Sequence, residues 1–300
     1  MDINEIKNLK NKRKITMLTA YDYPTAELVD RAGIDIILVG DSLANVVLGL
    51  DSTTKVGMAE MLHHAKAVTR AAKKSLVVGD MPYDSYQVNP VRDKTSQVSD
   101  GCLRQPVSNG VNPDAVKNAQ RFITEAGCRA IKLEWFARCL EVTGQIVSAG
   151  IPVMGHIGLT PQTVDKIGGF KVQGKDAQAA QRLIDQAIGL EEKGCFAIVL
   201  ECVPDKIAEL ITKKLKIPTI GIGAGVHCDG QVLVIHDMLG LFARYTPKFV
   251  KKYADLSPLI LKAVEGFKNE VIHEKFPGLE HSFSIKEEEL KKINGSQAVS

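Results

Sequence analysis

The sequence predicts an α/β protein whose parallel strands close into a single (β/α)8 barrel. Short apolar runs alternate with amphipathic helical patterns along most of the 300 residues. Runs this apolar are typical of strands that are buried on both faces, as in parallel sheets. The repeated β-α order fits either a closed barrel or an open doubly wound sheet, and the number of apolar runs, eight, favours the barrel.

The predicted strands are short segments rich in Val, Ile and Leu. They are 15–20, 34–40, 75–80, 128–134, 151–156, 195–201, 217–223 and 230–235. Between them, apolar residues three and four positions apart predict helices, several of which end in Gly, a common helix C-cap. These helical patterns cover 23–33, 58–74, 114–127 and 176–194. The sequence HDMLGLF after the eighth strand fits a loop or a short helix, and a last helix is expected over about 254–271.

Length and composition favour one domain. A content of 45% hydrophobic and 24% charged residues is ordinary for a globular protein. We expect one catalytic domain over residues 1–285 and a polar C-terminal tail over 286–300. The segment 91–113 is polar and aperiodic, and Val-Asn-Pro occurs both before it, at 88–90, and at its end, at 111–113. We interpret 91–113 as a disordered insertion in a surface loop; the alternative is an active-site lid, because the segment follows a barrel strand.

Charge and hydropathy exclude several classes of function. The 38 basic and 35 acidic residues are spread along the chain without a basic arm, so nucleic acid is not an expected partner. The sequence contains no run of 18 apolar residues, so no membrane span is predicted. The polar N-terminus does not resemble a secretion signal. Six cysteines without a CxxC pair predict free thiols. We therefore expect a cytoplasmic protein.

Chemically active side chains follow five consecutive predicted strands. They are Asp41 and Ser42 after the second strand, Asp80 at the end of the third, Lys132 and Glu134 in the fourth, His156 at the end of the fifth, and Glu201 at the end of the sixth. The carboxyl ends of parallel barrel strands meet at one mouth, where active sites of this fold lie. A single acid at such a position is commonly a helix N-cap or a solvated loop residue. Five strands with the same feature indicate a site.

Three of these acids predict a metal ion. Asp41, Asp80 and Glu134 would bring three negative charges into one small volume, which requires a compensating cation. Carboxylate oxygens without a His or Cys cluster favour Mg²⁺. Lys132 lies two positions from Glu134 and therefore shares its face of the strand. It either pairs with a substrate carboxylate or neutralises Glu134.

Two further residues have alternative roles. Glu201 ends a strongly apolar run, and burial there favours a general base that works near neutral pH. Its alternative role is an acid at the start of the next helix. His156, between two glycines, either contacts a substrate oxygen or is satisfied structurally. The glycine-rich run 221–230 lacks the lysine of a phosphate-binding loop, so close backbone approach explains it better.

Six motifs in one order resemble the ketopantoate hydroxymethyltransferase family. They are 40–49, 79–87, 131–134, 152–162, 199–204 and 221–241. The similarity extends from about Ile15 to Phe283, apart from the inserted loop. It implies a TIM barrel of the phosphoenolpyruvate/pyruvate superfamily type, bound Mg²⁺ and self-association, often as a decamer. Trp135 and Phe136 follow Glu134 where family members commonly have Gly-Gly, so bulk beside the metal site is expected.

The resemblance also implies an activity. The family transfers the methylene carbon of 5,10-methylenetetrahydrofolate to 3-methyl-2-oxobutanoate, giving 2-dehydropantoate for pantothenate biosynthesis through a magnesium-stabilised enolate. Asp41 and Asp80 match metal ligands that also face the substrate, Glu134 an acid that holds the metal, Ser42 and Lys132 substrate contacts, His156 a residue beside the substrate, and Glu201 the proton acceptor. Alternatives are another magnesium-dependent enzyme of 2-oxo acids, such as a carbon–carbon lyase, and an inactive remnant.

Overall fold

The computed structural model describes residues 1–87, 111–163, 171–242 and 244–295, which contain a closed parallel barrel. Its strands are β1 (Ile15–Thr19), β2 (Ile36–Val39), β3 (Leu76–Asp80), β4 (Ala130–Glu134), β5 (Val153–Gly158), β6 (Ala197–Glu201), β7 (Thr219–Ile222) and β8 (Gly230–Leu233). Each strand pairs in parallel with the next, and β8 closes the barrel on β1, with Ile15 opposite Gly230. All eight predicted strands are confirmed, and closure rules out the open sheet.

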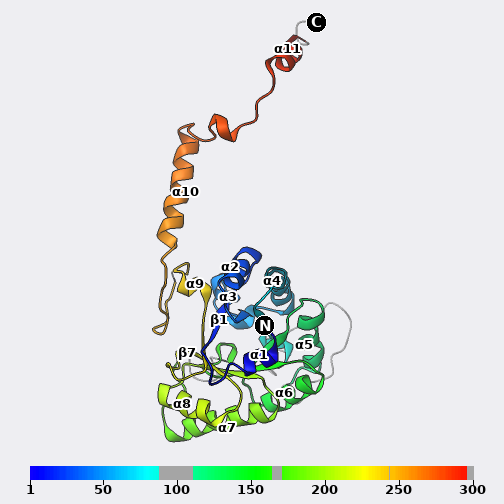
Figure 1. Cartoon of the computed structure of the whole chain (residues 1–300), viewed down its shortest axis with the longest axis vertical. Coiled ribbons are helices and arrows are strands. Elements are labelled where there is room, and N and C mark those ends of the chain that lie inside the picture. Colours follow the sequence, from blue (N-terminus) through cyan, green and yellow to red (C-terminus); the bar gives the residue numbers. More distant parts are fainter. Residues whose placement is uncertain (88–110, 164–170, 243, 296–300) are drawn as a thin grey trace. The chain divides into compact units, whose positions relative to one another are not determined.

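The described helices lie mostly between successive strands. They are α1 (Ile3–Lys7), α2 (Tyr23–Arg31), α3 (Leu43–Val46), α4 (Met58–Ala71), α5 (Ala115–Thr124), α6 (Cys139–Ser148), α7 (Ala177–Glu192), α8 (Asp205–Lys214), α9 (Ile235–Met238), α10 (Ser257–Ile272) and α11 (Glu287–Gly295). From α4 to α8 each packs against the next, and α2 packs against α4 (Figure 1). The four predicted helices correspond to α2, α4, α5 and α7, and the segment after β8 forms the short α9.

Local sequence signals start two of these helices. Asp22 precedes α2 and accepts a hydrogen bond from the backbone N–H of Thr25 at 2.8 Å. Asp176 precedes α7 and accepts one from the N–H of Ala179, also at 2.8 Å. Each side chain satisfies a donor that a helix N-terminus leaves free, and each carboxylate lies at the positive end of the helix dipole.

Alternate strand residues fill the barrel interior. The inward side chains include Met17, Leu38, Val78, Met154 and Ile220. Such layers make the barrel a packed core rather than a pore. The strand ends are therefore held rigidly, and this rigidity fixes the side chains that project from the carboxyl ends.

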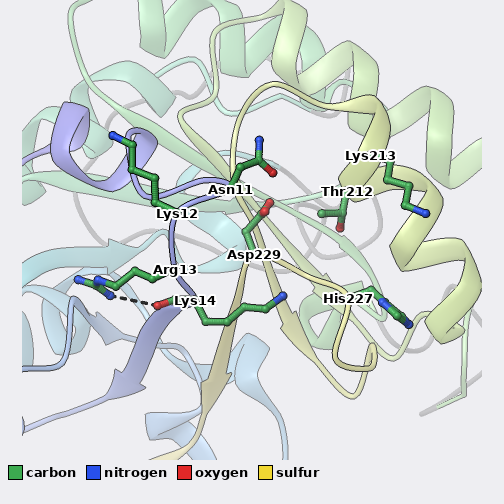
Figure 2. A pocket seen from close by; sticks show the side chains of 8 residues that line it. All are labelled: Asn11, Lys12, Arg13, Lys14, Thr212, Lys213, His227 and Asp229. Carbon is green, nitrogen blue, oxygen red and sulfur yellow. Dashed lines mark hydrogen bonds between the residues drawn. The ribbon is translucent and has the colours of Figure 1, made fainter.

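Ion pairs secure the amino ends of β1, β7 and β8. The part-buried Lys10 Nζ lies 2.6 Å from Asp229 Oδ2, which also accepts the N–H of Thr219 at 2.9 Å. Arg13 makes a two-pronged ion pair with Asp35 at 2.7 and 2.8 Å. A hollow of about 400 Å³ opens here, and Figure 2 shows Arg13 and Lys14 on one side of it. It is lined by Asn11, Lys12, Arg13, Lys14, Thr212, Lys213, His227 and Asp229. It lies at the end of the barrel opposite the predicted site.

The residues that flank 88–110 lie side by side. Gln87 and Val111 form an antiparallel bridge, and the backbone N–H of Asn112 donates to the carbonyl of Tyr86 at 3.1 Å. Most of the predicted insertion at 91–113 lies outside the described residues. Its disorder, the lid alternative and the single domain over 1–285 stay predictions.

The chain divides into two compact units. One comprises Met1–Met238 and Phe242–Lys251, and the other comprises Leu239–Leu241 and Lys252–Ser300, whose last five residues are outside the described ranges. In the second unit, Ser257 Oγ donates to the carbonyl of Gly240 at 2.6 Å. The predicted last helix is α10, in which no residue is buried.

The described residues bear on two properties expected from composition, membrane spans and cysteine pairing. No helix in the described ranges is both long and apolar enough to cross a membrane. Five cysteines are free thiols, which confirms the prediction for them. The sixth, Cys102, lies outside the described residues.

Candidate active site

Each predicted site residue lies at or just beyond the carboxyl end of a barrel strand. Asp41 and Ser42 follow β2, Asp80 and Glu201 are the last residues of β3 and β6, Lys132 and Glu134 lie in β4, and His156 lies in β5. All except Ser42 and Glu201 are buried. The eight-stranded closure thus brings residues from five strands to one mouth.

Strand register places Lys132 at the centre of this group. Asp80 lies opposite Lys132, and Glu134 lies opposite His156. Lys132 Nζ is 2.9 Å from Asp80 Oδ1, 3.6 Å from Glu134 Oε1 and 3.2 Å from His156 Nδ1. The backbone N–H of Asp41 donates to Asp80 Oδ2 at 3.0 Å. The closest carboxylate to Lys132 is therefore Asp80, on the neighbouring strand, rather than Glu134 on its own strand.

The charge of Lys132 is secured by its surroundings. Burial acts to lower the pKa of Lys132, but the attraction of Asp80, Glu134 and Asp41 outweighs it and raises that pKa above its ordinary value. The ammonium is therefore fully protonated at neutral pH. It neutralises part of the negative charge that the strands bring together.

His156 connects two glutamates. Its Nδ1 lies 3.3 Å from Glu134 Oε1, and its Nε2 lies 3.3 Å from Glu201 Oε2. Burial and the nearby Lys132 act to lower the pKa of His156, but contacts with the two glutamates raise it to about 9. The imidazole is therefore protonated on both nitrogens at neutral pH. It holds Glu201 in the charge network of the site.

The mouth carries an excess of negative charge. Four carboxylates, those of Asp41, Asp80, Glu134 and Glu201, face two cations, which leaves two negative charges without a counterion among the seven predicted residues. Burial together with the nearby Glu134 raises the pKa of Asp41, and burial raises the pKa of Asp80 to about 6. Both shifts express the cost of holding like charges away from water. A divalent cation would balance the site.

Three buried oxygens fit such a cation. Asp41 Oδ2, Asp80 Oδ1 and Glu134 Oε1 have no hydrogen-bond partner among the described residues, although Lys132 Nζ lies close to the last two. Hard carboxylate oxygens are the ligands that Mg²⁺ prefers. Within the described ranges, no three His, Cys, Asp or Glu side chains are already arranged as a metal site. Binding would therefore reorient at least one carboxylate. The donor set fits magnesium.

Glu201 occupies a different position from the other acids. It ends β6, whereas α8 begins at Asp205 with Pro204 as its N-cap, so Glu201 is not the capping acid of that helix. Its side chain is 15% exposed, and it is therefore accessible from the mouth. Gly158, with φ +98°, lets β5 approach closely: a Cβ there would lie 2.2 Å from the carbonyl oxygen of Glu201. The glycine is needed to place this acid.

Three residues of the mouth were not predicted from the sequence. Tyr21, fully buried after β1, shares a hydrogen bond of 2.8 Å with Ser42 Oγ. Tyr86, after β3, donates to Gln162 Oε1 at 2.5 Å, and Gln162, after β5, donates its backbone N–H to Glu134 Oε2 at 3.0 Å. All three follow barrel strands, so the same positional rule would have found them had it included uncharged polar residues.

The model of the family described as ketopantoate hydroxymethyltransferase matches residues 1–99 and 107–279. The chain belongs to this family. It is 52% identical over 284 residues to the 3-methyl-2-oxobutanoate hydroxymethyltransferase of Syntrophomonas wolfei, covering 95% of both chains. It is 51% identical over 292 residues to the enzyme of that name from Carboxydothermus hydrogenoformans, covering 97% of this chain and 98% of that one. The recognition of this ketopantoate hydroxymethyltransferase family from six motifs is confirmed.

Two solved structures that resemble this member of the ketopantoate hydroxymethyltransferase family share little sequence with it. Phosphoenolpyruvate phosphomutase from Streptomyces platensis superposes with a TM-score of 0.57 at 12% identity, covering 99% of this chain and 97% of that one. A 2,3-dimethylmalate lyase of the PEP mutase/isocitrate lyase superfamily gives 0.54 at 13% identity, covering 98% and 95%. At this identity the likeness concerns the fold alone, and it agrees with the predicted (β/α)8 barrel.

Proposed function

We propose that the chain transfers the methylene carbon of 5,10-methylenetetrahydrofolate to 3-methyl-2-oxobutanoate, which with water yields 2-dehydropantoate. Relatives named for this activity share about half of their residues with almost the whole chain. The observation that carries the proposal is the convergence of Asp41, Asp80, Glu134 and Glu201 around Lys132 and His156 at one barrel mouth. The product would enter pantothenate biosynthesis.

Glu201 is the proton acceptor in this proposal. The reaction needs removal of the proton at C3 of the oxo acid, and a positioned carboxylate of this kind contributes roughly 10²- to 10⁴-fold to a rate. The partial exposure of Glu201 lets substrate reach it, whereas the metal-holding acids are buried. His156 Nε2, 3.3 Å from Glu201 Oε2, orients the carboxylate.

The remaining residues would bind and orient the oxo acid. Asp41, Asp80 and Glu134 would hold magnesium. When bound, this ion supplies positive charge beside the carboxylate and ketone oxygens of the substrate. Lys132 adds a fixed positive charge in a water-poor site, where electrostatic stabilisation is strongest. Ser42, held by Tyr21, offers a hydroxyl at the rim of the same mouth.

Self-association is supported by the exposed surface of the second unit. Seven large apolar side chains of α10 are exposed in the single chain: Leu259, Ile260, Leu261, Val264, Phe267, Val271 and Ile272. Apolar side chains gathered on one exposed helix indicate an interaction site, and a lone helix of this length is marginal in water without packing. Assembly with further copies, as a decamer by resemblance, and a cytoplasmic location are part of the proposal.

Proton NMR tests the function directly. The full chain is incubated with 3-methyl-2-oxobutanoate and Mg²⁺, with and without 5,10-methylenetetrahydrofolate, in deuterated buffer. The expected result is loss of the C3 proton signal without the folate and formation of the hydroxymethyl product with it. Turnover of the oxo acid by carbon–carbon cleavage without folate would instead support the lyase alternative. If neither C3 proton exchange nor hydroxymethyl product is observed, the proposal is contradicted.

A further inference from the structure

Gln162 lies beside Glu134 and close to Asp80, two of the three acids that fit the metal. It lies in the short 3-10 turn Pro161–Thr163 after β5 and is 2% exposed. Its backbone N–H donates to Glu134 Oε2 at 3.0 Å, and its Nε2 donates at 3.1 Å to the carbonyl of Met81, the residue after Asp80. One buried residue thus links the ends of β3, β4 and β5.

The side-chain amide of Gln162 anchors the turn that carries this backbone N–H. A primary amide has two N–H donors and one oxygen acceptor. The contact with the Met81 carbonyl uses one of the donors and ties the turn to the end of β3.

Tyr86 uses the remaining acceptor and fixes the orientation of the amide. Its hydroxyl donates to Gln162 Oε1 at 2.5 Å, and both residues are buried. A flipped amide would turn its oxygen toward the Met81 carbonyl, and two acceptors repel each other. The Tyr86 ring packs against Phe136, with centroids 5.2 Å apart and planes at 54°.

The aromatic pair explains the residues that replace Gly-Gly after Glu134. The sequence predicted bulk beside the metal site. Phe136 is buried against Tyr86, so it supports the residue that orients Gln162. A continuous path of contacts therefore runs from Phe136 through Tyr86 and Gln162 to Glu134.

We propose that Gln162 is a positioning residue that holds Glu134 for a divalent cation through its backbone N–H, with its side-chain amide anchoring the turn and Tyr86 fixing the orientation of that amide. This inference rests on the metal site of the proposed function. Groups that hydrogen-bond metal ligands orient them before the ion arrives, and their loss typically weakens metal binding by about 10- to 100-fold. Gln162 acts through Glu134 and does not itself touch the substrate.

The test measures Mg²⁺ affinity of the full chain by calorimetric titration without substrate. Gln162→Leu keeps the backbone N–H but removes the side-chain contacts with Met81 and Tyr86 that anchor the turn, so it is expected to weaken Mg²⁺ binding by about 10- to 100-fold. Tyr86→Phe removes one hydroxyl and is expected to weaken it by roughly two- to tenfold. If Gln162→Leu does not fold, the Mg²⁺ affinity of Tyr86→Phe tests the positioning role.

Thr219→Val is the matched control. Thr219 is fully buried, and its hydroxyl bonds Asp229 and Thr212 near the amino ends of the strands, far from the mouth. This variant is expected to lower the melting temperature and to leave Mg²⁺ affinity unchanged. If the role of Gln162 were purely structural, Gln162→Leu would likewise lower the melting temperature and leave Mg²⁺ affinity unchanged.

The outcomes separate this inference from the proposed function. Folded Gln162→Leu and Tyr86→Phe proteins with wild-type Mg²⁺ affinity would overturn the positioning role alone. A wild-type chain that binds no Mg²⁺ would overturn both the positioning role and the metal site. A wild-type chain that binds Mg²⁺, loses affinity in the variants and yet makes no product would leave the positioning role standing and refute the activity.

Discussion

The buried ammonium of Lys132 gives the sharpest test of the charge arrangement. Lys132→Met keeps most of the volume and removes the charge 2.9 Å from Asp80 Oδ1. At an effective dielectric constant of about 20, the lost attraction is about 6 kcal/mol before desolvation is counted. Removing one partner of a buried ion pair typically costs about 3–5 kcal/mol in net terms. We expect the free energy of unfolding to fall by about that amount near pH 8.

This cost must depend on pH with a defined sign. Burial raises the pKa of Asp80 from 3.8 to about 6 while Lys132 opposes the rise. The folded chain therefore binds more protons than the unfolded chain between about pH 4 and 6, and stability falls as pH rises through that window. Without Lys132 the pKa of Asp80 rises further, and the fall in stability extends to higher pH. At about pH 5 Asp80 is mostly protonated in both proteins, so the stability difference should be small there and grow toward pH 8.

Urea unfolding measures the difference in the free energy of unfolding between the two proteins. It is followed by the fluorescence of the single tryptophan, Trp135, which is next to Glu134 in the chain. Wild type and Lys132→Met are compared with EDTA present, at equal protein concentration and at both pH values. Lys206→Met is the control, because Lys206 Nζ pairs with Glu209 at 3.1 Å on the surface and is 72% exposed. Its midpoint should match wild type at both pH values. A Lys132→Met midpoint equal to wild type, or a difference that does not grow with pH, would refute the reasoning.

Four further predictions test the remaining assignments. Glu201→Gln should slow C3 proton exchange of the oxo acid by at least about 100-fold with Mg²⁺ affinity unchanged, and wild-type exchange rates would remove it as the base. Asp41→Ala should weaken Mg²⁺ binding by more than about tenfold in the same calorimetric titration, and retained affinity would contradict its role as a ligand. Gly158→Ala should lower both stability and turnover, because its Cβ would meet the carbonyl of Glu201; unchanged denaturation and activity would show that the backbone there can shift. Phe267→Asp on α10 should reduce the mass of the assembly in light scattering, whereas Lys268→Asp, its exposed neighbour, should have less effect; an unchanged mass would exclude this face from the interface.

The sequence was sufficient to predict the barrel and the members of its mouth. Apolar strands of similar length, separated by helical patterns, leave few ways to bury both strand faces, and a count of eight favours closure over an open sheet. The carboxyl ends then share one side, which selects Asp80, Glu134 and Glu201 without any coordinates. The short helix after β8 and the extent of α10 depended on weaker local signals.

The partners inside the mouth were decided only by tertiary structure. Lys132 and Glu134 share a face but lie about 6.6 Å apart along one strand, whereas neighbouring strands are about 4.8 Å apart. The register that sets Asp80 beside Lys132 depends on how β3 packs on β4, and no local pattern contains it. The same holds for Gln162, whose contacts join three strand ends that are distant in the chain. Sequence alone determined which side chains reach the mouth, because periodicity and strand direction are local properties of the chain. Tertiary structure decided which of these side chains touch, because strand register and packing depend on residues that are distant in sequence.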